Sequence, residues 1–274
     1  MDGTSGKIFY GWKVVVALTV MLTFSSGLGF YNNAIMLQAL SRDSGFAIEV
    51  ASSAVSLFFL VSGLTGLVLA PIIEKHDVRF IIFAGALVSG LSLAAIGRSD
   101  SIASLFIAYA CFGAGFAASS LLPATTLVAR WFETSRAKAL SLASTGLSLG
   151  GITLTPLAAT LVAEYPLPDA SLIIGILYFA GVAPLCLVLR SSPQDLGLSP
   201  YGTSANPDTV LGGTSFKDAI GHSYFWLLSI AYVFSMAAQV GSIAHQYGLM
   251  TERVSSAEAS LGIAILPAVA LVGR

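Results

Sequence analysis

Charged residues are scarce in this sequence. Only 10% of its 274 residues are Asp, Glu, Lys or Arg, and 55% are hydrophobic, whereas a soluble domain has about 25% charged residues. A soluble protein of this size could not cover so much apolar surface. The composition therefore predicts an integral membrane protein, with the lipid bilayer as its partner. The net charge of −1 and the lack of a basic run give no indication of a nucleic-acid partner.

Cysteines and catalytic patterns are scarce as well. Cys111 and Cys186 lie in apolar stretches and match no metal or redox spacing, so we interpret them as packing residues. Gly146-Leu-Ser-Leu-Gly150 fits the hydrolase elbow pattern, but it lies in an apolar helix without a partner His or acid. No His/Glu metal spacing or convergent acid–base pair is found. We expect no enzyme activity, no catalytic residue, no cofactor and no metal.

Long stretches without charge dominate the chain. Ser101–Ala129 and Ala139–Ala163 contain no Asp, Glu, Lys or Arg and flank the short charged segment Arg130–Lys138. Each exceeds the roughly 20 residues that cross a bilayer core. The first apolar stretch is also too long for a signal-peptide core of about 7–15 residues. The pattern predicts an all-α membrane protein with helices over Val14–Ser41, Val50–Ile73, Phe80–Gly97, Ser101–Ala129, Ala139–Ala163, Ala170–Leu189 and Ala219–Thr251, and an eighth beginning at Ala259.

A change of composition divides the chain. Residues 191–218 include Pro193, Pro200 and Pro207 and lack a long apolar run, which is typical of a linker. We expect residues 1–190 to form an amino-terminal six-helix transmembrane bundle, and residues 219–274 to begin a second bundle with its first two helices. Because transporters are often built from two six-helix halves, we expect a carboxyl-terminally truncated sequence or one partner of a pair.

The distribution of basic residues predicts the orientation. Basic loops tend to remain in the cytoplasm. One side of the predicted topology holds nine Lys and Arg residues: Lys7, Lys13, Lys75, Arg79, Arg130, Arg136, Lys138, Arg190 and Lys217. The other side holds Arg42, Arg98 and Arg253. We therefore predict a multi-pass protein of the cell (plasma or inner) membrane, with the amino terminus and the linker in the cytoplasm.

Four segments resemble the major facilitator superfamily, in particular its branch of monocarboxylate transporters and oxalate:formate antiporters. They are Tyr10-Gly-Trp12; Trp131-Phe132 with Arg136, Ala139, Ala143 and Gly146; Pro193–Gly202; and His245–Tyr247 with Ala257–Ala259 and Gly273-Arg274. The resemblance implies alternating access by a secondary active transporter of small organic anions, monocarboxylates above all, with proton symport or anion exchange. It implies the major facilitator fold for the two bundles.

The segment Glu74–Arg79 takes the place of the family's loop between helices 2 and 3. The resemblance implies a cytoplasmic charge latch there, with Glu74 as the acid, Lys75 and Arg79 as the bases, and Asp77 where glycine is usual. Arg130 and Arg136 of the next cytoplasmic loop are assigned to the same latch. An acid and a base at a helix end can pair in one state and separate in the other. The alternative is that these charges only anchor the loop in water.

The resemblance also implies a substrate site between the bundles. In the family, an arginine of helix 8 pairs with the substrate carboxylate, and Arg274 matches it; the alternative is that Arg274 marks the cytoplasmic end of that helix. Polar residues of helices 1 and 7 complete the candidate set: Tyr31, Asn32, Gln239 and His245. Phe30 stands where animal monocarboxylate transporters carry a lysine, so a helix 1 lysine does not carry over.

Two other functions remain open from the sequence. A facilitator for an uncharged or cationic solute is favoured by the lack of charge within the six amino-terminal helices, because intramembrane ionisable residues usually mark substrate and proton paths. A non-transporting, incomplete membrane protein is favoured by the missing helices of the second bundle.

Overall fold

The computed structural model describes residues 9–202 and 216–272. Within these ranges the chain is helical and contains one isolated β-bridge, between Phe132 and Tyr201. The elements are α1 (Tyr10–Ser25), the π-helix η1 (Ser26–Tyr31), α2 (Asn32–Asp43), α3 (Ile48–Lys75), α4 (Val78–Ile96), α5 (Ile102–Ala118), α6 (Leu121–Trp131), α7 (Arg136–Glu164), α8 (Leu167–Val182), the 3-10 helices η2 (Ala183–Leu187) and η3 (Pro193–Leu196), α9 (Phe216–Ala219), α10 (Ser223–Thr251) and α11 (Ser256–Val272).

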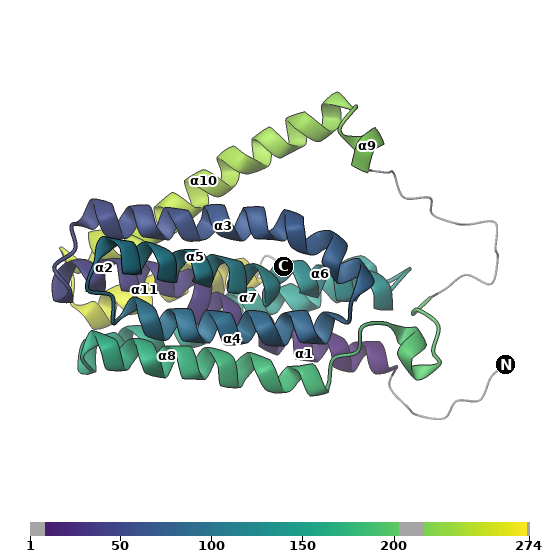
Figure 1. Ribbon diagram of the computed structural model, residues 1–274, viewed down its shortest axis with the longest axis horizontal. Coiled ribbons are helices and arrows are strands. Elements are labelled where there is room, and N and C mark those ends of the chain that lie inside the picture. Colours follow the sequence, from purple (N-terminus) through teal and green to yellow (C-terminus); the bar gives the residue numbers. More distant parts are fainter. Residues whose placement is uncertain (1–8, 203–215, 273–274) are drawn as a thin grey trace.

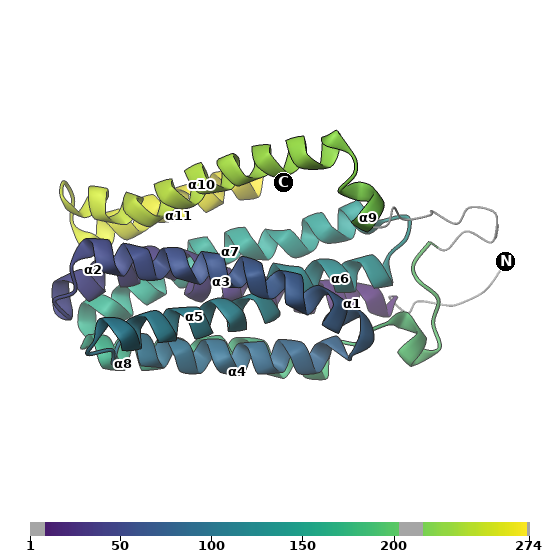
Figure 2. The ribbon, with the colours of Figure 1, turned by 45° about the horizontal axis from the view of Figure 1, so that its top comes forward.

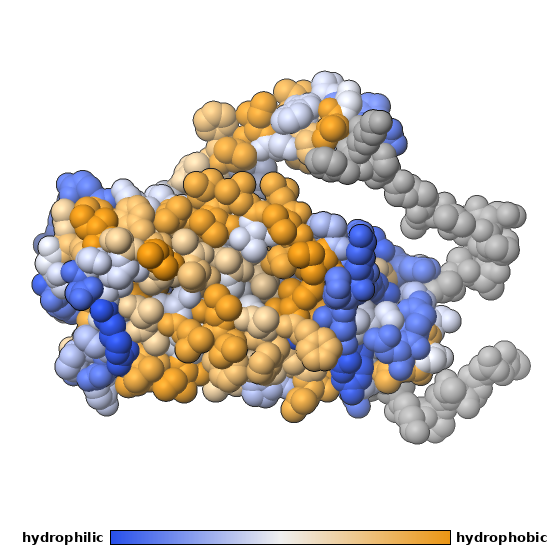
Figure 3. Space-filling view, viewed as in Figure 1, coloured by the Kyte–Doolittle hydropathy of each residue, from blue (hydrophilic) through white to orange (hydrophobic). Residues whose placement is uncertain are grey.

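The all-α membrane architecture is confirmed. Seven helical segments of the described chain are long and apolar enough to cross a bilayer, and α11 is an apolar helix of 17 residues. The space-filling view shows a broad hydrophobic band with hydrophilic residues gathered at both ends (Figure 3). Large apolar side chains such as Leu67, Phe80 and Leu91 are exposed on this surface, as expected where a helix faces lipid instead of water.

The first six spans lie side by side along the long axis of the molecule (Figure 1). We call the end that holds Tyr10, the α3–α4 turn and the α6–α7 turn the linker end. We call the opposite end, with the α2–α3 and α10–α11 turns, the far end. Tight α1–α7 contact is possible because α7 has glycines where it meets α1: a Cβ at Gly146 would lie 2.1 Å from the carbonyl oxygen of Thr19. Small residues permit such close packing of membrane helices.

Two of the predicted helices are interrupted at neighbouring places. The first span changes to a π-helix at Ser26–Tyr31, and the fourth breaks at Ser119–Ser120, between α5 and α6. The Ser25 hydroxyl donates a hydrogen bond to the Ser120 hydroxyl between these two places, with a distance of 3.5 Å between the oxygens. At the same break the Ser119 hydroxyl donates to the Gly115 carbonyl at 2.9 Å, so a buried side chain satisfies a backbone group inside the bundle.

The helices α10 and α11 contact the first bundle from the far end. α10 packs against α2, and α11 packs along α7. From there α10 diverges, so that its beginning lies well away from α3 at the linker end (Figure 1; Figure 2). The two parts of the chain are therefore joined at the far end and apart at the linker end.

Candidate functional site

A charged cleft of about 730 Å³ opens at the linker end. Its walls come from the carboxyl end of α3, the α3–α4 turn, the end of α6 and the segment that follows η2. Charged side chains dominate the lining, which consists of Glu74, Lys75, His76, Asp77, Arg79, Arg130, Arg190, Ser191, Ser192, Gln194 and Asp195. The predicted latch residues therefore gather in one place, apart from Arg136.

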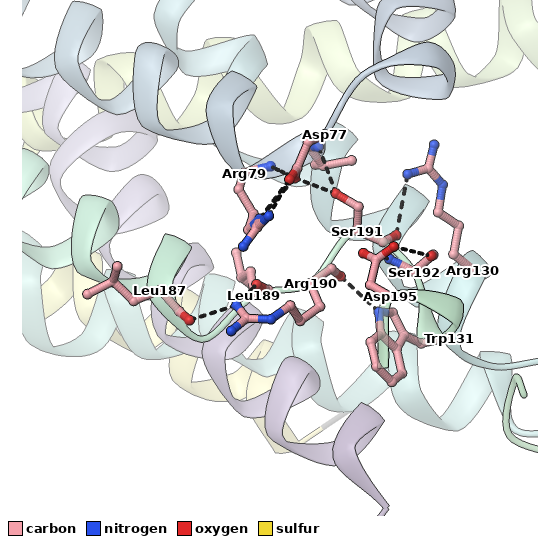
Figure 4. Close-up of polar contacts among 11 residues, drawn as sticks. Asp77, Arg79, Arg130, Trp131, Leu187, Leu189, Arg190, Ser191, Ser192 and Asp195 are labelled. Carbon is pink, nitrogen blue, oxygen red and sulfur yellow. Dashed lines mark hydrogen bonds and ion pairs between the residues drawn. The ribbon is translucent and has the colours of Figure 1, made fainter. Parts of the chain in front are cut away.

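Asp77 is the centre of the hydrogen-bond network in this cleft (Figure 4). Its carboxylate caps α4 by accepting the backbone N–H of Arg79 at 3.0 Å, and it accepts the Arg79 Nε at 2.8 Å. The Ser191 hydroxyl donates to the same carboxylate and accepts the Val78 N–H at 3.0 Å. The bond from the Arg79 side chain, supported by that from Ser191, lowers the pKa of Asp77 from 3.8 to about 2.

Arg130 connects three segments of the linker end. It donates from Nη2 to the carbonyl of Ile73 near the end of α3, at 2.7 Å, and from Nη1 to the carbonyl of Ser191 at 3.4 Å. A cation at this place satisfies a carbonyl that the helix end leaves free. Arg136 instead holds its own turn, because it donates to the carbonyls of Phe132 and Ala129 at 3.2 and 3.0 Å.

In this structure the carboxylate that pairs with Arg79 is Asp77, whereas the resemblance to the family assigned the acid of the latch to Glu74. Neither Glu74 nor Lys75 forms an ion pair with another residue of the ranges 9–202 and 216–272. An Asp immediately before a helix is a common N-cap, and that signal could have identified Asp77. No local signal indicates Ser191, because it lies more than 110 residues further along the chain.

An aromatic cluster lies beside the charged cleft. The ring of Tyr201 packs on Phe9, Trp12 and Phe132, with centroid distances of 5.2, 6.1 and 5.8 Å. The Tyr201 N–H also donates to the Trp131 carbonyl at 2.9 Å, and the Tyr201 carbonyl accepts the Glu133 N–H at 3.1 Å.

The cluster brings together three segments that are distant in the sequence: Tyr10-Gly-Trp12, Trp131-Phe132 and Pro193–Gly202. Near it, the Trp131 indole N–H donates to the Arg190 carbonyl at 3.0 Å (Figure 4). Arg190 and the first part of the predicted linker, up to Tyr201, are thus bound to the amino-terminal bundle. We call these residues, 190–201, the strap.

His245 lines three clefts, one within the second part of the chain and two between the two parts. The largest, about 930 Å³, is lined by α10 and α11 residues including Gln246, Glu252 and Glu258. The second, about 440 Å³, extends to Gln38 of α2. The third, about 390 Å³, lies between α3 and α10. Among the predicted substrate residues that the structure describes, His245 is therefore the one that lines these clefts.

The other predicted substrate residues are scattered. Tyr31 lies beside Gly151 of α7 and Pro267 of α11. Asn32 is buried, and its Oδ1 has no hydrogen-bond partner among the described residues. Gln239 is exposed and lines none of the three clefts. Arg274 lies outside the described residues.

Comparison with known families gives one broad match. The family model described as Major Facilitator Superfamily matches residues 19–274. The chain is 25% identical over 191 residues to "Membrane sensor protein UhpC" of Salmonella typhimurium, covering 65% of this chain and 43% of that protein. It is 24% identical over 276 residues to "MFS-type transporter pytF" of Aspergillus terreus, covering 97% and 87%.

Solved structures share the fold. A bacterial homolog of the human lysosomal transporter Spinster, in an inward-facing and unoccupied conformation, aligns with a TM-score of 0.74 at 21% identity, over 98% of this chain and 62% of that one. Its inward-facing and occupied form aligns with a TM-score of 0.71 at 19% identity, over 98% and 60%. The present chain thus spans less than two thirds of these structures and of the sensor protein.

Proposed function

Since the chain belongs to the Major Facilitator Superfamily, we propose that it moves a small organic anion, a monocarboxylate, across a membrane by alternating access. In such a mechanism two bundles rock about a central site and expose it to one side at a time. The transport is secondary active, with proton symport or anion exchange. The observation that carries the proposal is that α10 meets the first bundle at the far end and diverges from it at the linker end.

The linker end is the cytoplasmic end in this proposal. The amino terminus, the strap and the basic loops then lie in the cytoplasm of a cell-membrane protein, in agreement with the excess of Lys and Arg. The state described here is consequently open to the cytoplasm. A small epitope tag at Ser204, in the part of the linker outside the described residues, tests the orientation. Antibody labelling of that tag in intact cells would contradict it.

The charged cleft acts as the cytoplasmic latch. In the present state Asp77 holds Arg79, and Arg130 holds the end of α3. Glu74 and Lys75 line the same cleft without an ion pair among the described residues. We assign them to contacts with the second bundle that form when the linker end closes. Exchange of ionic partners at helix ends is a common way to stabilise two alternate packings.

Arg274 is the proposed substrate anchor. Its planar guanidinium can bind a carboxylate through two parallel hydrogen bonds and stays charged at every accessible pH. We assign to Tyr31, which lies near Pro267 of α11, a contact with the substrate from helix 1. His245, Asn32 and Gln239 complete the proposed site as polar residues of helices 1 and 7.

Substitution of Arg274 tests the substrate class. In the protein expressed from its complete reading frame, Arg274→Ala and Arg274→Lys are expected to abolish uptake of radiolabelled monocarboxylates, because neither residue offers the bidentate fork. Membrane insertion, measured by the amount of protein in the membrane fraction, is expected to stay at the parental level. Unchanged uptake in both variants would remove Arg274 from the site.

Two specific observations favour other functions. The membrane-spanning parts of the first six helices lack Asp, Glu, Lys and Arg, which favours a facilitator for an uncharged or cationic solute. The 25% identity to a membrane sensor protein favours a non-transporting role. Uptake assays separate the three functions. Uptake of an anion supports the proposed transporter, and uptake of only an uncharged or cationic solute supports the facilitator. No uptake by a properly inserted protein supports the non-transporting role.

A further inference from the structure

We propose that the contact of Gly151 with Pro267, beside Tyr31, is the gate contact that keeps the far end closed, and that it must break when the far end opens. The inference rests on the proposed alternating access and adds to it the residues that set the balance between the two states. A glycine that packs inside one bundle stabilises both states equally, whereas Gly151 would stabilise the state with the closed far end.

The contact joins the two parts of the chain. Gly151 belongs to α7 of the first bundle and Pro267 to α11 of the second. A Cβ added to Gly151 would lie 2.7 Å from Pro267 Cγ, 2.9 Å from Pro267 Cβ and 2.9 Å from Tyr31 Cε2. These distances are shorter than the 3.5–4.0 Å of ordinary carbon contacts. The two helices can therefore pack this closely only because residue 151 has no side chain.

The contact lies deep in the membrane. Gly151 is 13 residues before the far end of α7, and Pro267 is 11 residues after the beginning of α11 at the same end. At 1.5 Å per residue, both are about 17–20 Å from the far end, more than half of a bilayer core of about 30 Å. Between the contact and the far end, α11 packs along α7. To open a path from the far side to this depth, α11 must move away from α7.

Two other glycines at the junction of the two parts, Gly248 and Gly241, differ from Gly151 in what an added Cβ would meet. A Cβ at Gly248 of α10 would meet the side-chain amide of Gln38 at 2.4 Å, and that flexible amide can move aside. A Cβ at Gly241 of α10 would meet no atom within 4 Å, although Gly241 lines the cleft between α3 and α10. Only at Gly151, among these three, does the added carbon meet a proline ring fixed in a helix.

A methyl group at position 151 should therefore act selectively. The methyl group clashes with Pro267 while the far end is closed, and this clash ends when α11 moves away. The substitution therefore lowers the population of the state described here. Overpacking of this kind changes an equilibrium by about tenfold. The same methyl at position 241 should leave the equilibrium unchanged.

The experiment measures access from the far side. Ala259 lies near the beginning of α11 at the far end and is buried against Ala34 of α2 in the state described here, so labelling of Ala259→Cys reports on the movement of α11 away from the first bundle. In a background with Cys111 and Cys186 replaced by alanine, a membrane-impermeant maleimide is added to intact cells, and the labelling rate is measured. Gly151→Ala is expected to raise the rate about tenfold, and the matched control Gly241→Ala is expected to leave it within twofold.

A second variant separates the clash from general damage. Pro267→Gly removes two of the three atoms that a Cβ at residue 151 would approach within 3 Å and leaves only the Tyr31 ring atom, so Gly151→Ala/Pro267→Gly is expected to lower the labelling rate towards the parental level. If Gly151→Ala alone is not inserted but the double variant is, the clash with Pro267 is confirmed. Unchanged labelling in Gly151→Ala, an equal rise in Gly241→Ala, or failure of both Gly151 variants to insert would overturn the proposal.

The assay does not depend on the proposed substrate. Labelling needs no transport, so a rise in Gly151→Ala without any anion uptake would retain the gate and reject the substrate. If the Ser204 tag shows the opposite orientation, the same labelling is done on inside-out vesicles, where the far end is then exposed.

Discussion

Substitution of Asp77 by asparagine tests whether the charged cleft holds the linker end together. Asparagine keeps the size of the side chain and one acceptor oxygen, but it removes the negative charge that faces Arg79 and replaces the second oxygen, which accepts the Arg79 Nε, by an NH2 donor. Glu74→Gln is the matched control, because Glu74 lines the same cleft without an ion pair among the described residues. We expect Asp77→Asn to lower the stability of the amino-terminal bundle and Glu74→Gln to leave it unchanged.

The size of the effect follows from the pKa of Asp77. A decrease from 3.8 to about 2 corresponds to about 2 kcal/mol of preference for the charged form. Since 26% of the side-chain surface remains exposed, solvent screening reduces this contribution to about 1 kcal/mol. For a bundle of this length, 1 kcal/mol shifts the melting temperature by about 2–4 °C. Fluorescence-detected size exclusion after heating in detergent can measure this difference.

The pH dependence gives the same prediction a second check. The folded pKa of Asp77 is below its unfolded value, so its contribution is fully present above about pH 4 and is lost as pH falls from there towards 2. The difference in melting temperature between the parent and Asp77→Asn should therefore be constant from pH 5 to 8. A difference that vanishes within that range, or an equal loss in Glu74→Gln, would refute the reasoning.

Two further predictions concern the strap and the helix packing. Tyr201→Ala removes the ring that binds the strap to the aromatic cluster. Trypsin added to inside-out vesicles should therefore cleave after Arg190 several times faster in this variant. An unchanged rate would mean that the strap does not depend on the cluster. Gly146→Val places a side chain against the Thr19 carbonyl and should reduce the amount of folded protein by tenfold or more. The control Gly63→Val should leave the amount of folded protein unchanged, because a Cβ at Gly63 meets no atom within 4 Å. Equal amounts of the two variants would contradict the close α1–α7 contact.

The helices could be predicted from the sequence because each depends on local composition. A long charge-free run has few alternatives to a membrane helix, and the structure places a helix at each of the eight predicted runs. The π-helix at Ser26–Tyr31 and the break at Ser119–Ser120 lie inside such runs. Hydropathy carries no sign of them, although Ser120 and the nearby Pro123 are typical of a helix start.

The candidate site could be predicted only in part. The position of the latch loop follows from its charges, but the partner of Arg79 depends on the N-cap geometry of Asp77. The strap was expected to be linker because its composition is that of a linker. Its contacts with Trp131 and Phe132 join residues about 60 positions apart or more, and no local pattern encodes such a contact.

Uptake by the protein expressed from its complete reading frame tests the central claim most directly. Cells expressing it are given radiolabelled lactate, pyruvate, formate or oxalate, with and without a pH gradient. Alternating access for a small organic anion predicts saturable uptake of at least one of them, driven by inward protons or by exchange for an internal anion, and lost in Arg274→Ala. If a properly inserted protein takes up none of these anions under either condition, the proposed substrate class is contradicted.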